Sequence, residues 1–133
     1  MKTLIVATAC AAVLALTGVS QAAKISSAGI FGVEFQDRAE CVVLNFGNTP
    51  VAVTVNIFAG SGVLLATSNC GGPLGPGQFC NVVRNSPPPF ENEPVSCSVT
   101  APSTTNLRGA IVIEESPFPG HGPFHLVRSA PLR

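Results

Sequence analysis

The side chains best able to do chemistry are four cysteines, Cys41, Cys70, Cys80 and Cys97. In an oxidising compartment an even number of cysteines predicts disulfides, and four allow three pairings. A zinc site with four cysteine ligands is the alternative, but the spacing contains no C-x2-C pair. The segment between Cys70 and Cys80 is rich in Gly and Pro and can fold back over a short span. We therefore favour the pairs Cys70–Cys80 and Cys41–Cys97.

His121 and His125 are the only histidines, within the segment PGHGPFH. Side chains four residues apart converge on a metal when they lie on a helix, but the surrounding Pro and Gly residues exclude that helix. In an extended chain the same spacing is roughly 13 Å, too long for shared coordination. A curled loop that also brought in Glu114 or Glu115 would make these histidines weak metal ligands. We expect no resident metal and no cofactor.

The residues needed for hydrolytic or thiol catalysis do not occur in a recognisable arrangement. Asp37 is the only aspartate, no serine lies in a strand-to-helix G-x-S-x-G turn, and no C-x-x-C motif is present. Two carboxylate pairs, Glu91 with Glu93 and Glu114 with Glu115, are typical of solvated surface rather than of a buried acid and base. The sequence therefore predicts a protein that is not an enzyme.

Three other features suggest contacts with a partner rather than chemistry. Arg108 begins a well-patterned strand on the face opposite Leu107, and could be either a surface residue or a contact residue. The segment 87–90, PPPF, could be a displayed ligand or a stiff connector between facing sheets. The stapled segment between Cys70 and Cys80 could serve as a rigid plug for another protein's active site, which would make the protein a secreted inhibitor.

The N-terminal region has the order of features found in a secretory signal peptide. Lys2 supplies a positive charge, residues 4–16 are apolar except for one Thr, and small residues at Ser20 and Ala22 suit cleavage. The apolar stretch is shorter than the roughly 20 residues that cross a bilayer. A retained N-terminal anchor is the alternative. A lipoprotein would need Cys10 as its first mature residue, but Cys10 comes too early, with only half of the apolar stretch before it.

Cleavage after Ala22 divides the chain into a signal peptide, residues 1–22, and a single domain, residues 23–133. The short, Ala-rich signal is typical of bacteria, so we expect the mature protein to be secreted or periplasmic. No later apolar run is long enough for a membrane span. The formal net charge is zero and charged residues make up 11% of the chain, which argues against nucleic acid as a partner.

Alternating apolar and polar residues predict strands in the mature domain. The clearest are 51–59, 95–100 and 107–114, and residues 41–46 are apolar on both faces, as in a central strand. The alternation in 95–100 points Cys97 inward. Weaker candidates cover 30–35, 63–67, 79–84 and 124–129.

Turn signals separate these segments. Residues 47–50, GNTP, predict a tight hairpin between two strands, and residues 60–62, GSG, predict the next turn. Seven or eight short strands in about 110 residues predict an all-β fold, an immunoglobulin-like antiparallel β-sandwich. A small β-barrel is the alternative.

Three segments carry a resemblance to a known kind of module: CVVLNFGNTPVAVTVNIFAGSGVLL, GPGQFC and NLRGAIVIEE. This rhythm of strands and turns resembles CARDB-like and related immunoglobulin-like modules of bacterial exported proteins, and small secreted bacterial proteins of unknown function. The resemblance covers residues 40–115 and implies an adhesive or structural role by analogy. We therefore expect a non-enzymatic module that contacts another protein or a cell-surface component. The alternatives are the secreted inhibitor and a periplasmic metal-binding protein that uses His121 and His125.

Overall fold

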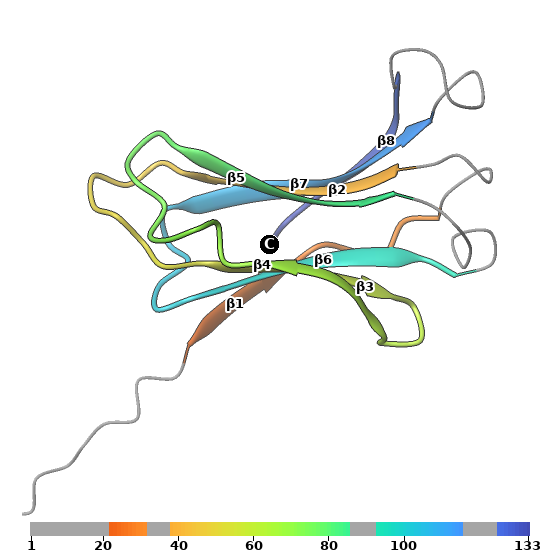
Figure 1. Ribbon diagram of the computed structural model, residues 1–133, viewed down its shortest axis with the longest axis horizontal. Helices are drawn as coiled ribbons and strands as arrows, with labels where there is room; N and C mark the ends of the chain where they lie inside the picture. Colours follow the sequence, from red (N-terminus) through yellow and green to blue (C-terminus); the bar gives the residue numbers. More distant parts are fainter. Residues whose placement is uncertain (1–21, 32–37, 86–92, 116–124) are drawn as a thin grey trace, which may run out of the picture.

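The computed structural model describes residues 22–31, 38–85, 93–115 and 125–133 (Figure 1). The described residues form strands, turns and loops and contain no helix. The eight strands are β1 (Ala23–Ser26), β2 (Arg38–Asn45), β3 (Thr54–Ala59), β4 (Leu64–Ser68), β5 (Phe79–Asn85), β6 (Val95–Ala101), β7 (Leu107–Glu115) and β8 (His125–Pro131). The predicted signal peptide lies outside the described residues except for Ala22, and its cleavage stays a prediction.

The strands form two layers (Figure 1). Sheet I has the order β1-β6-β3-β4, and sheet II has the order β5-β2-β7-β8. All neighbouring strands are antiparallel. The prediction of an all-β, immunoglobulin-like antiparallel sandwich is confirmed, with this strand order as its particular form. Over the described residues neither sheet closes into a barrel, so the alternative prediction of a small β-barrel is wrong.

The chain changes layer at most of its connections. Among the described strands, only β3–β4 and β7–β8 are consecutive strands within one sheet. The turn at residues 60–62 makes the first of these hairpins, with Gly62 N donating to Ala59 O at 2.8 Å. The hairpin predicted for residues 47–50 is wrong, because β2 and β3 lie in different sheets. Crossing between layers lets Val43 and Val55, both fully buried, share one core.

The first strand lies earlier than the sequence indicated. Strand β1 covers Ala23–Ser26, whereas the prediction placed a strand at residues 30–35. Ile30 forms only an isolated bridge to Val95, and residues 32–35 lie outside the described part. Strand β1 is an edge strand with only β6 beside it in sheet I. One apolar side chain, Ile25, is therefore enough to pack it against the core.

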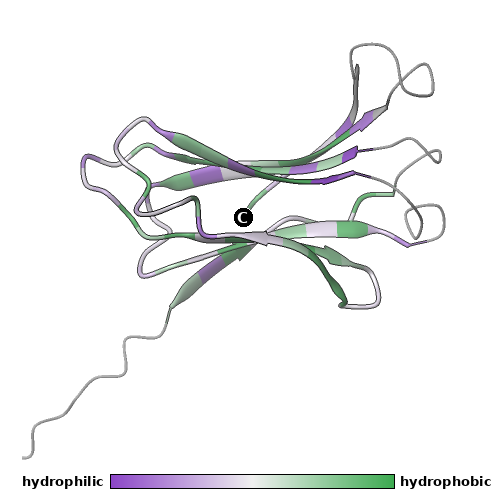
Figure 2. Ribbon diagram, in the orientation of Figure 1, coloured by the Kyte–Doolittle hydropathy of each residue, from purple (hydrophilic) through white to green (hydrophobic). Residues whose placement is uncertain are grey.

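The core lies between the layers and is built from the inward side of each alternating strand. Figure 2 shows hydrophobic stretches along strands of both layers. The largest buried aliphatic side chains come from β3 and β7: Ile57, Leu107, Ile111 and Ile113. Strand β2 is central in sheet II, as its apolar residues on both faces indicated.

Both lateral edges of the sandwich are joined. At one edge Ser26 and Arg133 exchange two backbone hydrogen bonds of 3.1 Å, linking β1 to the residues that follow β8. At the other edge the Cys70–Cys80 disulfide links the segment after β4 to β5. These links hold the layers together and leave the two outer sheet faces as the broad surfaces of the domain.

Candidate functional site

The four cysteines lie in two pairs at disulfide distance. Cys41 of β2 is bonded to Cys97 of β6, with their Cα atoms 5.8 Å apart. Cys70 is bonded to Cys80 of β5, with Cα atoms 5.7 Å apart. This is the pairing that the spacing favoured. The first bridge crosses the core between the central strands of the two sheets, and two such bridges indicate an oxidising compartment.

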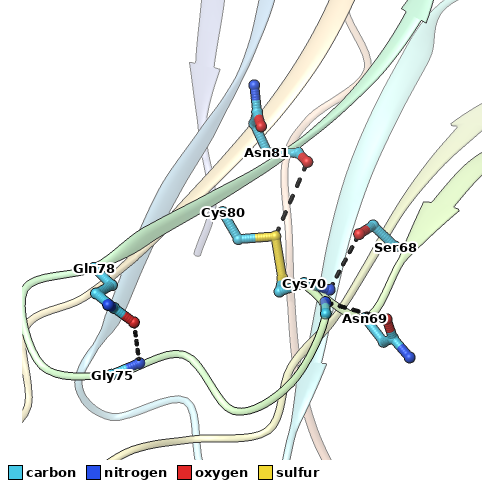
Figure 3. The surroundings of a disulfide bond; sticks show 8 residues. Ser68, Asn69, Cys70, Gly75, Gln78, Cys80 and Asn81 are labelled. Atoms are coloured by element: carbon cyan, nitrogen blue, oxygen red, sulfur yellow. Dashed lines mark hydrogen bonds between the residues drawn. A yellow bond between two sulfur atoms is a disulfide. The ribbon is translucent and has the colours of Figure 1, made fainter.

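The segment between Cys70 and Cys80 is closed by its disulfide (Figure 3) and is also hydrogen-bonded to the body of the domain. Leu74 is buried and exchanges two backbone hydrogen bonds with Val51, of 2.8 and 3.0 Å. Gly77 N donates to Asn45 O, and Asn45 N donates to Gln78 O. Because these bonds point the backbone of the segment inward, the geometry favours a structural role over that of a projecting plug.

Tight turns within this segment need unusual backbone angles. Cys70 has φ 61°, and Gly71, Gly72 and Gly77 also have positive φ. A left-handed conformation is unusual for a residue other than Gly. The bridge to Cys80 and the bond from Cys70 N to Ser68 Oγ, 3.1 Å long, hold Cys70 in that conformation.

The candidate metal ligands are not assembled in the part of the chain that the structure describes. His121 lies outside that part, and His125 is described only as the first backbone position of β8, opposite Glu115. Among the described residues no group of three His, Cys, Asp or Glu side chains could hold a metal ion.

Of the paired carboxylates in the sequence, Glu93 and Glu114 are engaged in local contacts. Glu114 accepts a bond from Arg38 Nε at 2.8 Å and a second from the same guanidinium. Glu93 accepts a hydrogen bond from Ser61 Oγ at 3.0 Å. Glu114 is thus part of an ion pair at one end of sheet II rather than simple solvated surface.

Arg108 lies where the strand pattern predicted, outward at the start of β7, while Leu107 is buried. Its Nη1 donates to the carbonyl oxygens of Thr105 and Leu107, at 3.0 and 2.7 Å. Across the sheet Arg108 is paired with Leu44, which is paired in turn with Phe79. Arg108 therefore lies at the edge of an apolar surface.

That apolar surface covers the outer side of sheet II, and we call it the contact face. Its most exposed members are Phe46, Phe79 and Val83, with 65%, 68% and 37% of their surface accessible. On β5 the exposed Asn81 lies between Phe79 and Val83. Half-buried apolar side chains of β2 and β7 lie beside this strand, with Val42 paired to Asn81 on one side and to Ala110 on the other. Phe46 follows β2 and shares the outward side of Leu44 by alternation.

Charges border this face at both strand ends. Arg108 lies at one end, and Arg38, Glu40 and Glu114 lie at the other, with Arg38 Nη2 3.5 Å from Glu40 Oε2. An apolar centre with a charged rim is the usual anatomy of a surface that binds another protein. Sequence reasoning missed the face because its residues come from separate strands.

No protein-family model matches the chain, and no curated protein or solved structure matches it. Over the described residues no helix is long and apolar enough to cross a membrane.

Proposed function

We propose that this chain is an exported, bacterial, non-enzymatic β-sandwich module that acts by binding another protein or cell-surface component through the contact face. The predicted signal peptide and the two disulfides support a secreted or periplasmic location. The role is structural or adhesive, in line with the resemblance to CARDB-like modules.

The observation that carries this proposal is the exposure of Phe46, Phe79 and Val83 on one sheet face. Large aromatic side chains supply much of the affinity of a binding surface, because they bury a large area at a small entropic cost. Their exposure is costly in water unless a partner covers them. The contact face also lies on the sheet opposite the edge hydrophobics Val63 and Leu64, which provide a matched comparison.

The test places a photo-crosslinking amino acid at position 79 or at position 64 of the protein, in the producing bacterium. We expect position 79 to give a discrete crosslinked species that position 64 does not give. The double substitution Phe46→Ser and Phe79→Ser should reduce retention of the labelled protein on the cell envelope. The matched control, Val63→Ser with Leu64→Ser, should not. Equal crosslinking from both positions, or none from position 79, would refute the proposal.

A further inference from the structure

A groove lies on the outer face of sheet I. Because the two sheets are the two layers of the domain (Figure 1), the groove is on the opposite side from the contact face. It has a volume of about 550 Å³, within the range of small-molecule sites. We call it the sheet I groove. Its lining comes from β1, β6 and β3 and the turns beside them, and includes Lys24, Ser26, Phe58, Pro94, Ser96 and Ser98.

Ser98 is the most unusual side chain in this groove. Its neighbours along β6, Cys97 and Val99, are fully buried in the core, so alternation turns Ser98 to the outer face. It is nevertheless only 3% exposed, and its Oγ has no hydrogen-bond partner. A buried hydroxyl without a partner costs free energy. A ligand that bonded Ser98 Oγ would recover that loss.

Lys24 of β1 is paired with Thr100 of β6, and Phe58 of β3 is paired with Ser96. A contact between the Lys24 and Phe58 side chains therefore passes over Ser98. The register places Ser98 opposite Ser26 of β1 and opposite Asn56 of β3. The Nζ atom of Lys24 lies 5.8 Å from the centre of the Phe58 ring. This cation–π contact lies across the buried hydroxyl, which has less than 1 Å² of accessible surface.

The charge of Lys24 is not neutralised by an ion pair with any carboxylate of the described residues. Its ammonium group offers three donors and no acceptor. An anionic group that drew the ammonium of Lys24 away from the Phe58 ring would therefore uncover the hydroxyl of Ser98 and meet both groups. The groove thus combines the positive charge of Lys24 with the neutral hydroxyl of Ser98.

The remaining lining favours a ligand that is itself rich in hydroxyl groups. Ser26 and Ser96 carry hydroxyls that both donate and accept hydrogen bonds, which suits partners of the same kind. Phe58 and Pro94 supply apolar surface at the sides, against which the C–H face of a sugar ring can pack. A simple inorganic anion would use Lys24 but leave this apolar surface uncovered.

We propose that the sheet I groove binds a saccharide unit that carries a carboxylate, with the carboxylate on Lys24 and a ring hydroxyl on Ser98. This site is separate from the contact face and does not depend on the proposed function. It would give the module a second specificity, for acidic polysaccharide, on the opposite sheet.

Three probes separate the parts of this proposal in amide-resolved NMR titrations of the mature exported protein. Glucuronic acid carries both hydroxyls and a carboxylate, glucose carries only hydroxyls, and acetate carries only a carboxylate. We expect glucuronic acid to shift the amides of Ser26, Phe58 and Ser98, and the other two probes to bind about tenfold more weakly or worse. Equal binding of acetate, or no shift with glucuronic acid, would overturn the proposal.

The substitution Ser98→Ala gives two readouts that a structural role would not combine. Because the hydroxyl has no partner, we expect its removal to leave the unfolding midpoint unchanged or raised, while glucuronic acid binds about tenfold more weakly. Lys24→Gln should weaken binding of glucuronic acid toward that of glucose. Ser129→Ala, on the exposed outer side of β8, is the matched control and should change neither property. Lower stability or unchanged binding in Ser98→Ala would contradict the assignment.

Discussion

The side-chain amide of Asn45 donates a hydrogen bond of 2.9 Å to the carbonyl oxygen of Leu74, which lies 29 residues later in the chain. Asn45 is fully buried at the end of β2. Its Nδ2 also donates to Thr49 O, and its Oδ1 accepts from Gly47 N, both at 2.8 Å. One side chain thus holds the connection from β2 to β3 in place and anchors the disulfide-closed segment between Cys70 and Cys80.

Replacing Asn45 by Ala should therefore destabilise the domain strongly. Three hydrogen bonds are lost: Gly47 N and Thr49 O lose their side-chain partner, and Leu74 O keeps only the bond from Val51 N. At about 0.5–1.5 kcal/mol for each bond, we expect a loss of roughly 3 kcal/mol. The urea-unfolding midpoint measures it. The control is Asn81→Ala, because Asn81 is exposed and bonds only to Glu40 at its side chain. An Asn45→Ala midpoint equal to that of the control would be inconsistent with the anchoring role.

The two disulfides should contribute unequally to stability. Cys41 and Cys97 are fully buried and close a loop with a sequence separation of 56, whereas Cys70 and Cys80 are separated by 10. The chain-entropy model gives roughly 4 kcal/mol for the long loop and roughly 3 kcal/mol for the short one. Core volume is also lost in the first case.

We accordingly expect the Cys41→Ala/Cys97→Ala protein to unfold at clearly lower denaturant than the Cys70→Ala/Cys80→Ala protein. Peptide mapping of the unreduced protein provides the control on pairing. The reverse order of midpoints would show that the bridge across the core is not the principal covalent constraint.

Gly109 should not tolerate a side chain. A Cβ atom at this position of β7 would lie 2.2 Å from the carbonyl oxygen of Val42 and 2.5 Å from Leu132 Cδ1. A backbone oxygen within a sheet cannot move aside easily, so Gly109→Ala should cost at least about 2 kcal/mol. Gly62→Ala is the comparison, since it meets no atom but has φ +86°, and should cost about 1–2 kcal/mol. Thermal unfolding of both variants checks this order.

Export should remove the first 22 residues and leave no free thiol. N-terminal sequencing of the exported protein should begin at Ala23 or Lys24, so that β1 stands at the start of the mature chain. Thiol labelling of the denatured, unreduced protein should find no reactive cysteine. A mature species that retains Met1 would contradict the signal peptide, and stoichiometric labelling would contradict the two bridges.

Local alternation was sufficient to predict most strands, because burial on one side imposes a period of two on the sequence. Val55 and Ile57 of β3 and Cys97 of β6 all point into the core as their spacing indicated. The same alternation did not predict β1, a four-residue edge strand in which only Ile25 is a large apolar residue.

Pairing partners were harder to predict than strands. The turn at residues 47–50 has hairpin residues, yet buried Asn45 and its bonds to Thr49 and Leu74 direct the chain to the other sheet. The contact face and the sheet I groove depend on register between strands distant in sequence, such as Leu44 beside Phe79. Single-sequence patterns carry no information on that register.

The bridge between Cys41 and Cys97 also sets how far the domain can be stretched. If the domain is pulled from its two ends, the chain between Cys41 and Cys97, with a sequence separation of 56, cannot extend. Roughly 190 Å of contour length, at about 3.4 Å per residue, stays locked while the bond is intact. Only the flanking segments can extend, so β2 and β6 remain joined under load. Reduction of this one bond would allow the enclosed chain to extend as well, so the domain could be stretched much further.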